Sequence, residues 1–98
     1  MDLKATRDPE ASELYHFASA TQIASRHVLE IGCGKGQLTG QYASLPAQLV
    51  AIDPDEDSLR VAREKKIDSA CLHFARADGC SLPFPAGTFD LAFFASSL

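Results

Sequence analysis

Three glycines at alternate positions, directly after a short apolar run, carry the clearest chemical signal in this sequence. They are Gly32, Gly34 and Gly36, and the run before them contains Glu30. Glycine has no Cβ, so its backbone adopts positive φ angles readily and can approach a ligand closely. A strand that enters such a turn and leaves it as a helix forms the ligand-binding corner of an open α/β sheet. We therefore predict a ligand-binding turn here.

Two further acids follow apolar runs that could form neighbouring strands. Asp53 comes after one run and Asp78 after another. An acid at the position of Asp53 can accept hydrogen bonds from both ribose hydroxyls of an adenosine. From the residues alone, the alternatives are a helix-capping acid before Pro54 and a turn-forming aspartate before Gly79. We favour a ligand role for Asp53, because the glycine turn lies at the matching strand end. We favour one for Asp78, because the three sites agree in order and spacing.

Other binding motifs fit the sequence less well. The dinucleotide pattern G-x-G-x-x-G needs its third glycine at position 37, where this chain has Gln37. The P-loop pattern G-x-x-x-x-G-K-[ST] does not occur in the sequence. Cys33, Cys71 and Cys80 form no C-x-x-C pair, which predicts free thiols and no metal site. The histidines suggest no general base, so no catalytic residue is predicted.

The elements that must position these residues alternate between strand and helix patterns. We predict strands and helices over these residues: helix 10–24, strand 27–31, helix 37–45, strand 49–52, helix 56–66, strand 71–75 and strand 89–94. This alternation predicts an α/β fold with a parallel sheet and flanking helices. Right-handed connections place the helices 37–45 and 56–66 on one face, and the fourth strand returns beside the first.

The connection between the predicted strands 71–75 and 89–94 is unusually short for a crossover between parallel strands. It has only the loop 78–88, without a helical pattern, where a dozen or more residues and a helix are usual. We therefore expect one sheet face to be poorly covered and the fourth strand to be an unprotected apolar edge. Such a surface predicts a homodimer, paired through residues 90–97, or a missing C-terminal half as partner.

Size and charge limit the function classes. The 98 residues form one small domain, with a net charge of −4 that argues weakly against a nucleic-acid-binding surface. No apolar run approaches the ~18 residues of a membrane span. The first residues have no apolar signal core, so a cytoplasmic location is expected.

Three segments of the chain resemble one known family. The pattern acid-x-Gly-x-Gly-x-Gly at residues 30–36 matches motif I of the class I S-adenosylmethionine (SAM) dependent methyltransferases. Residues 74–79 and 82–91 closely resemble the small-molecule members, which include the quinone-biosynthesis and sterol groups. The resemblance covers residues 10–98 but only the first half of the family's domain. It implies a Rossmann-like sheet, truncated after the fourth strand, over a single partial domain at 1–98.

The resemblance also implies a SAM site and roles for its residues. The acid at Asp78 would receive the adenine amino group, and the Gly79 N–H would meet the ring. Glu30 would help to hold the cationic methionine portion, often indirectly. A carboxylate suits the sulfonium and ammonium groups of SAM but would repel the pyrophosphate of NAD. The full set of expected cofactor-binding residues is Glu30, Gly32, Cys33, Gly34, Gly36, Asp53, Pro54, Asp78, Gly79 and Ala95.

The function implied is methyl transfer from SAM to a small molecule. The alternative is a SAM-binding or partner-dependent module, a truncated homologue without independent catalytic activity. A nucleotide-dependent oxidoreductase ranks third, because of Gln37 and Glu30. The chain has Ala-Ser-Ser-Leu at residues 95–98, where amino-methylating nucleic-acid enzymes carry an Asn/Asp-Pro-Pro-aromatic motif. A nucleic-acid substrate is therefore not expected, and the identity of the acceptor is not predicted.

Overall fold

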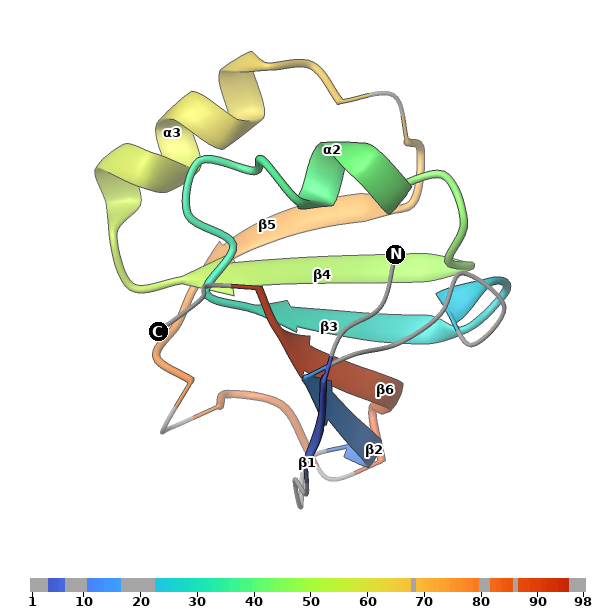
Figure 1. Ribbon diagram of the computed structural model, residues 1–98. Helices are drawn as coiled ribbons and strands as arrows, with labels where there is room; N and C mark the ends of the chain where they lie inside the picture. The colour runs from blue at the N-terminus through green and yellow to red at the C-terminus, as the bar shows by residue number, and fades with distance from the viewer. Residues whose placement is uncertain are drawn as a thin grey trace.

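A single mixed sheet organises the molecule. The computed structural model describes residues 4–6, 11–16, 23–67, 69–79, 82–85 and 87–95. The described elements are β1 (Lys4–Thr6), β2 (Ala11–His16), β3 (His27–Ile31), α2 (Thr39–Tyr42), β4 (Gln48–Asp53), α3 (Glu56–Glu64), β5 (Leu72–Arg76) and β6 (Phe89–Phe94). The strands form one sheet in the order β1-β2-β6-β3-β4-β5, as Figure 1 shows. All neighbouring pairs are parallel except β1 and β2.

The strand positions and the order of the last four strands confirm the sequence prediction. β3 and β6 have the predicted bounds, while β4 is longer by one residue at each end and β5 is shifted by one. β6 lies beside β3, so the chain does return next to its first predicted strand. In the register, Leu29 of β3 faces Val50 on one side and Ala92 on the other.

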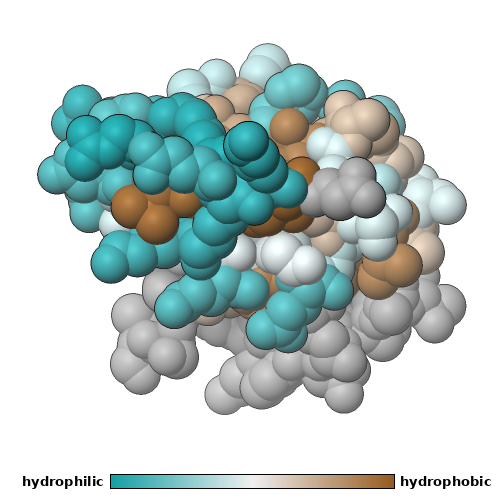
Figure 2. Space-filling model, turned by 90° about the horizontal axis from the view of Figure 1, so that it is seen from above, coloured by the Kyte–Doolittle hydropathy of each residue, from teal (hydrophilic) through white to brown (hydrophobic). Residues whose placement is uncertain are grey.

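Both described helices lie on the same side of the sheet (Figure 1). α3 begins at a capping residue, Asp55, whose side chain accepts from the Asp57 N–H, and it buries Leu59 and Ala62. Figure 2, which looks down on this side, shows hydrophilic residues gathered over the region of α3. α2 is much shorter than the predicted helix 37–45, because the chain continues in turns until Leu38 and regular helix spans only four residues.

The two faces of the sheet build separate parts of the core. On the helix side, Val28, Leu49, Leu91 and Phe93 are buried together with Tyr42 of α2. A second buried group contains Leu29, Ile31, Ile52 and Ala92, whose side chains lie on the opposite face, together with Phe89 at the start of β6. Loop side chains Leu82 and Phe84 pack against this second group. The Phe84 and Phe89 rings meet edge to face at 5.0 Å.

The expectation of a poorly covered face is therefore wrong. In Figure 1 the connection between β5 and β6 passes on the side of the sheet opposite the helices. It contains no helix among its described residues, yet its apolar side chains Leu82 and Phe84 supply the cover that a helix would give. Among the described residues, Leu45 is the exposed large hydrophobic side chain, with 38% of its surface accessible.

The N-terminal prediction is also wrong. Residues 11–16 form strand β2 and not the start of a helix over 10–24. β2 pairs in parallel with β6, with Ala11 opposite Phe89 and Tyr15 opposite Phe93. The edge of a buried strand offers a row of backbone hydrogen bonds, and this pairing outweighs a weak helical pattern. It follows that β6 is paired on both sides and is not the open edge expected. Residues 17–22 of the predicted helix lie outside the described residues.

Candidate functional site

The residues singled out in the sequence gather at the carboxyl end of the parallel strands. Gly32, Gly34 and Gly36 follow β3, and Asp53 is the last residue of β4. Beyond the ends of these and the neighbouring strands lie the remaining predicted residues, which are Cys33, Pro54, Asp78, Gly79 and Ala95. The Ala95 N–H donates to the Ile31 carbonyl at 2.8 Å, so the end of β6 stays joined to the end of β3. In open α/β sheets this is the end where ligands bind.

The turn after β3, residues 32–38, is called the glycine loop below. It is fixed to β4 at its start, because the Gly32 and Cys33 N–H groups both donate to the Ile52 carbonyl, at 2.8 and 2.9 Å. Gly34 has φ +55°, and a Cβ built there would have no atom within 4 Å. Gly36 has φ +81°, and its Cβ would lie 3.2 Å from the Ala62 Cβ of α3. Gly36 is therefore needed for packing, while Gly34 leaves open space.

Asp53 joins the glycine loop to the turn after β4. Its Oδ2 accepts from the Gly34 N–H at 2.9 Å, and its Oδ1 accepts from the Asp55 N–H at 2.9 Å. The residue is half-buried. A carboxylate has about four acceptor positions, so these two bonds leave capacity for further donors such as hydroxyl groups. Asp53 thus combines a structural task with the capacity to bind a ligand.

Glu30 lies inside the core, under α2. Its side chain is 0% exposed, and its carboxylate accepts hydrogen bonds from Thr39 Oγ1, at 2.9 Å, and from the Tyr42 hydroxyl. Burial raises the pKa of Glu30 from 4.5 to about 7, against the two hydroxyl hydrogen bonds, which lower it. The charge argument for SAM over a dinucleotide is therefore weaker than the sequence suggested. Glu30 is enclosed and is partly protonated near neutral pH.

Cys33 also faces the interior. It is 6% exposed and packs in a small cluster with Ala51 and Leu59. Burial raises the pKa of its thiol to about 12, and the nearby Glu30 and Asp53 charges act in the same direction. Any contribution of Cys33 to a ligand site therefore comes from its backbone and its volume, not from thiolate chemistry.

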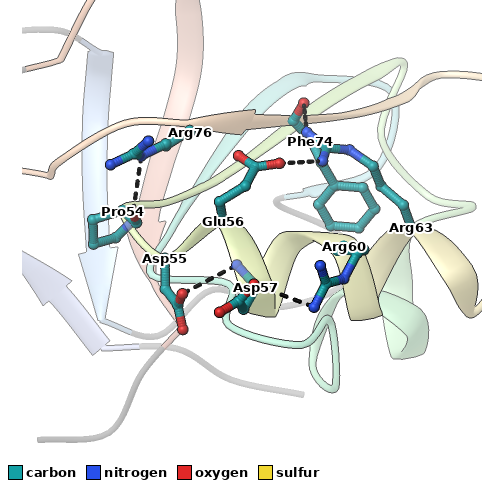
Figure 3. Close-up of polar contacts among 8 residues, drawn as sticks. All are labelled: Pro54, Asp55, Glu56, Asp57, Arg60, Arg63, Phe74 and Arg76. Atoms are coloured by element: carbon teal, nitrogen blue, oxygen red, sulfur yellow. Dashed lines mark hydrogen bonds and ion pairs between the residues drawn. The ribbon is translucent and has the colours of Figure 1, made fainter.

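The turns after β4 and β5 are tied together (Figure 3). Arg76 Nε donates to the Pro54 carbonyl at 3.1 Å, and the Ala77 N–H donates to the Asp53 carbonyl at 3.2 Å. Asp78 is exposed beyond these bonds. A Cβ on Gly79 would lie only 2.6 Å from Ile31 Cγ2, so this turn passes directly over the end of β3. The expected ribose and adenine residues are thus held in one unit.

The acids at the start of α3 serve the helix itself. Asp55 accepts from the Asp57 N–H at 3.1 Å and from Ser58 Oγ at 2.8 Å. The hydrogen bond from Ser58, followed by the one from Asp57, lowers the pKa of the Asp55 carboxyl. Figure 3 also shows the exposed ion pairs Arg60–Asp57 and Arg63–Glu56. Exposed pairs of this kind contribute little to stability and indicate no ligand site.

Three residues that shape the site have no signal in the local sequence. The sequence predicts that Thr39 and Tyr42 lie in a helix. It does not predict that their hydroxyl groups bond to Glu30. It places Arg76 only near a strand end, although its side chain holds the turn at Pro54. An acid in a buried strand could have given a signal, since buried carboxylates need hydrogen-bond donors nearby.

Metal and membrane features can be stated for the described part of the chain. There, no group of three or more His, Cys, Asp or Glu side chains is arranged to hold a metal ion. Nor does any described helix have the length and apolar character to cross a membrane.

Comparison with known proteins agrees with this geometry. Residues 28–98 match the family model described as "Methyltransferase domain". An O-methyltransferase, cnsE, from Penicillium expansum is 37% identical over 76 residues, which are 74% of this chain and 28% of that protein. The ubiquinone/menaquinone biosynthesis C-methyltransferase UbiE of Teredinibacter turnerae is 41% identical over 69 residues, 64% of this chain and 28% of that protein. The chain thus matches 28% of the length of either relative.

A solved structure gives the same answer for the fold. The SAM-dependent methyltransferase from Mesorhizobium loti superposes with a TM-score of 0.65 at 26% sequence identity, covering 74% of this chain and 33% of that one. The family match covers β3 from its second residue, the whole of β4, β5 and β6, and the turns that follow β3, β4 and β5. The chain therefore belongs to the methyltransferase domain family of class I, SAM-dependent enzymes, and it spans the N-terminal portion of that domain.

Proposed function

We propose that this chain is a SAM-dependent methyltransferase that transfers a methyl group to a small molecule, and that its described part forms the cofactor site. One observation carries the proposal. The Asp53 carboxylate holds the glycine loop through Gly34, and it has acceptor capacity left for the ribose of an adenosine. Membership of the SAM-dependent family supports SAM over other cofactors that contain adenosine. The charge of Glu30 alone does not distinguish them, because burial raises its pKa to about 7.

The proposed roles follow from the placement of each residue. Asp53 would accept from the ribose hydroxyls, and the open space beside Gly34 would admit the cofactor close to the backbone. Asp78 would accept from the adenine amino group, with the Gly79 N–H near the ring. The remaining contacts would come from the backbone along the same sheet end, at Gly32, Cys33, Gly36, Pro54 and Ala95. Glu30 would act only indirectly, through the loop, because it is fully buried.

SAM supplies a methyl group that its sulfonium already activates toward displacement. What the protein must add is position, since holding two reactants in line accounts for much of the rate of such a reaction. The glycine loop and the two turns tied by Arg76 would hold the donor side. No described residue is assigned as a general base. The proposed roles therefore concern the binding of SAM and not the binding of the methyl acceptor.

The acceptor is proposed only as a small molecule. Two of the curated relatives are named as an O-methyltransferase and a C-methyltransferase, and they match this chain with similar identity. The matched segment therefore does not distinguish the accepting atom. A net charge of −4 supports a small molecule over a nucleic acid, whose phosphates favour basic surfaces. The cytoplasmic location expected from the sequence stays a prediction.

For assembly, the structure supports a different proposal from the sequence. A dimer through β6 is no longer proposed, because β6 is paired with β2 and β3. We propose that the described part of the chain needs no second copy to cover its core, since both sheet faces are buried. Sedimentation velocity at micromolar concentration should show a folded monomer, and a stable dimer would contradict this.

Transfer of label from radioactive SAM tests the proposed activity. The purified chain is incubated with methyl-labelled SAM and an extract of small metabolites, beside Asp53→Ala. We expect label in a small-molecule product with the wild-type chain and none with the variant. Saturable SAM binding without transfer would replace the enzyme with the alternative, a SAM-binding or partner-dependent module. A folded chain that neither binds nor transfers would overturn both.

A further inference from the structure

The short helix α2 has few features that would stabilise it by itself. It has only four residues, Leu38 at its N-cap makes no side-chain hydrogen bond, and its first turn contains no acid. Helices this short are not stable in water through their own backbone bonds, because nucleation is costly. It also contains Gly40, which disfavours helix. Contacts outside the helix must therefore hold α2 in place.

Besides the apolar packing of Tyr42, the polar contacts of α2 meet at one buried carboxyl group. Thr39 Oγ1 lies 2.9 Å from both Oε1 and Oε2 of Glu30, and the Tyr42 hydroxyl donates to Oε1. All three side chains are buried, with exposures of 0%, 0% and 1% for Glu30, Thr39 and Tyr42. In the described part of the chain no buried side-chain polar atom lacks a hydrogen bond. The cluster is thus complete in itself and has no opening to a ligand.

This cluster closes the base of the glycine loop. Glu30 lies in β3 just before the loop, and Thr39 and Tyr42 lie in α2 just after it. The Tyr42 ring in turn packs edge to face on Phe93 of β6, with ring centroids 5.4 Å apart. The two ends of the loop are therefore joined to each other and to the middle of the sheet. Between these ends, the Gly34 N–H points to Asp53 and the Gly36 N–H to the Cys33 carbonyl.

We propose that Glu30, Thr39 and Tyr42 form a buried clamp that holds the glycine loop in its ligand-binding shape, so that Thr39 and Tyr42 are positioning residues for the cofactor site. The clamp acts by preorganisation. A loop that is already ordered loses less entropy when a ligand binds to it. The consequence for SAM rests on the proposed function, whereas the effect on the loop does not.

Two variants remove the clamp with little change in shape. Thr39→Val replaces the hydroxyl by a methyl group, and Tyr42→Phe keeps the ring that packs on Phe93. Thr39→Ser is the matched control, because it keeps the hydroxyl that bonds to Glu30. Phe89→Leu is the control for general destabilisation, since Phe89 is buried at the opposite end of β6 from the glycine loop.

Amide hydrogen exchange of the ligand-free chain is the first readout. In Thr39→Val/Tyr42→Phe we expect the amides of Gly34, Gly36 and Gly40 to exchange roughly tenfold faster or more, relative to the strand amides. The factor follows from the loss of the two buried hydroxyl hydrogen bonds to Glu30. Thr39→Ser should behave like the wild type. Phe89→Leu should change all protected amides together. Loop amides that follow the strand amides in the double variant would overturn the clamp.

SAM affinity is the second readout. We expect the double variant to bind SAM roughly tenfold more weakly, in step with the faster local opening, and Thr39→Ser to retain the wild-type affinity. Phe89→Leu should lower stability while leaving the dissociation constant unchanged. If the folded wild-type chain binds no SAM, the proposed function fails, and the exchange measurement still decides whether the clamp exists. Unchanged affinity in a double variant with faster loop exchange would overturn the positioning role.

Discussion

The backbone N–H of Gly34 donates a hydrogen bond of 2.9 Å to Oδ2 of Asp53, and this bond joins the glycine loop to the end of β4. The same carboxylate accepts from the Asp55 N–H at 2.9 Å. Asp53 therefore orders two turns at the site before any ligand binds. A residue with this placement affects both stability and binding, so the two effects must be measured separately.

The stability effect is tested with Asp53→Ala. Loss of two hydrogen bonds to a half-buried carboxylate should lower the free energy of unfolding by about 1–3 kcal/mol in urea titrations at neutral pH. Asp57→Ala is the control, because Asp57 lies in an exposed ion pair with Arg60. The control should change stability by less than about 0.5 kcal/mol. Equal effects of the two variants would contradict the structural task of Asp53.

Glu30 predicts an unusual dependence of stability on pH. Its pKa is about 7 in the folded chain, against an ordinary value of 4.5, so the folded state holds its proton to higher pH than the unfolded state. Stability from this group is therefore fully present below pH ~4.5 and is lost as the pH rises through ~7. Across this pH range, the raised pKa of Glu30 lowers the free energy of unfolding by about 3 kcal/mol. The raised pKa values of Tyr42 and Cys33 lie above this window.

Glu30→Gln isolates this effect. The glutamine side chain resembles the protonated carboxyl in shape and charge, and it cannot ionise, so the variant should not lose stability in this pH range through position 30. Urea unfolding between pH 5 and 8 should show the wild type losing stability relative to the variant, with most of the change between pH 5 and 7. Parallel pH profiles for the two proteins would show that the Glu30 pKa is not raised by burial.

The two inner glycines of the loop should differ in what they tolerate. Gly36→Ala brings a Cβ to 3.2 Å from Ala62 in addition to the strain of positive φ, whereas Gly34→Ala has free space around it. We expect about 1 kcal/mol of lost stability for Gly34→Ala and about 1–3 kcal/mol more for Gly36→Ala. Thermal unfolding provides the measurement. Equal stability of the two variants would contradict the close packing of the loop on α3.

The cysteines should differ in reactivity. A thiol with a pKa of about 12 is ionised in about one molecule in ten thousand at pH 8, and Cys33 is also buried. Cys71 is half-buried. Iodoacetamide labelling followed by peptide mass spectrometry should therefore modify Cys71 in the native chain and Cys33 only in denaturant. Rapid native labelling of Cys33 would show that the glycine loop opens readily.

The parts predicted correctly from the sequence have local causes. An apolar run followed by alternate glycines defines β3 and its turn, and the position of Asp53 follows from the next apolar run. These signals need no knowledge of distant contacts. The return of the fourth strand beside the first was part of the predicted topology, and the pairing of β6 with β3 confirms it.

The parts predicted wrongly depend on distant contacts. Residues 11–16 form a strand because β6 lies beside them, and no local pattern shows this. The second sheet face is covered because Leu82 and Phe84 fold back from an irregular loop. The burial of Glu30 depends on hydroxyl groups that come from α2. In each case a tertiary partner decides the structure, and a sequence window does not contain that partner.

Calorimetric titration of the folded chain with SAM and S-adenosylhomocysteine would decide whether this end of the sheet binds the cofactor. Asp53→Ala is titrated beside it, and circular dichroism shows that both are folded. We expect saturable binding of both ligands by the wild-type chain and its loss in the variant, because Asp53 holds the loop and would accept from the ribose. No binding by the folded wild-type chain, or equal binding by the folded variant, would contradict this expectation.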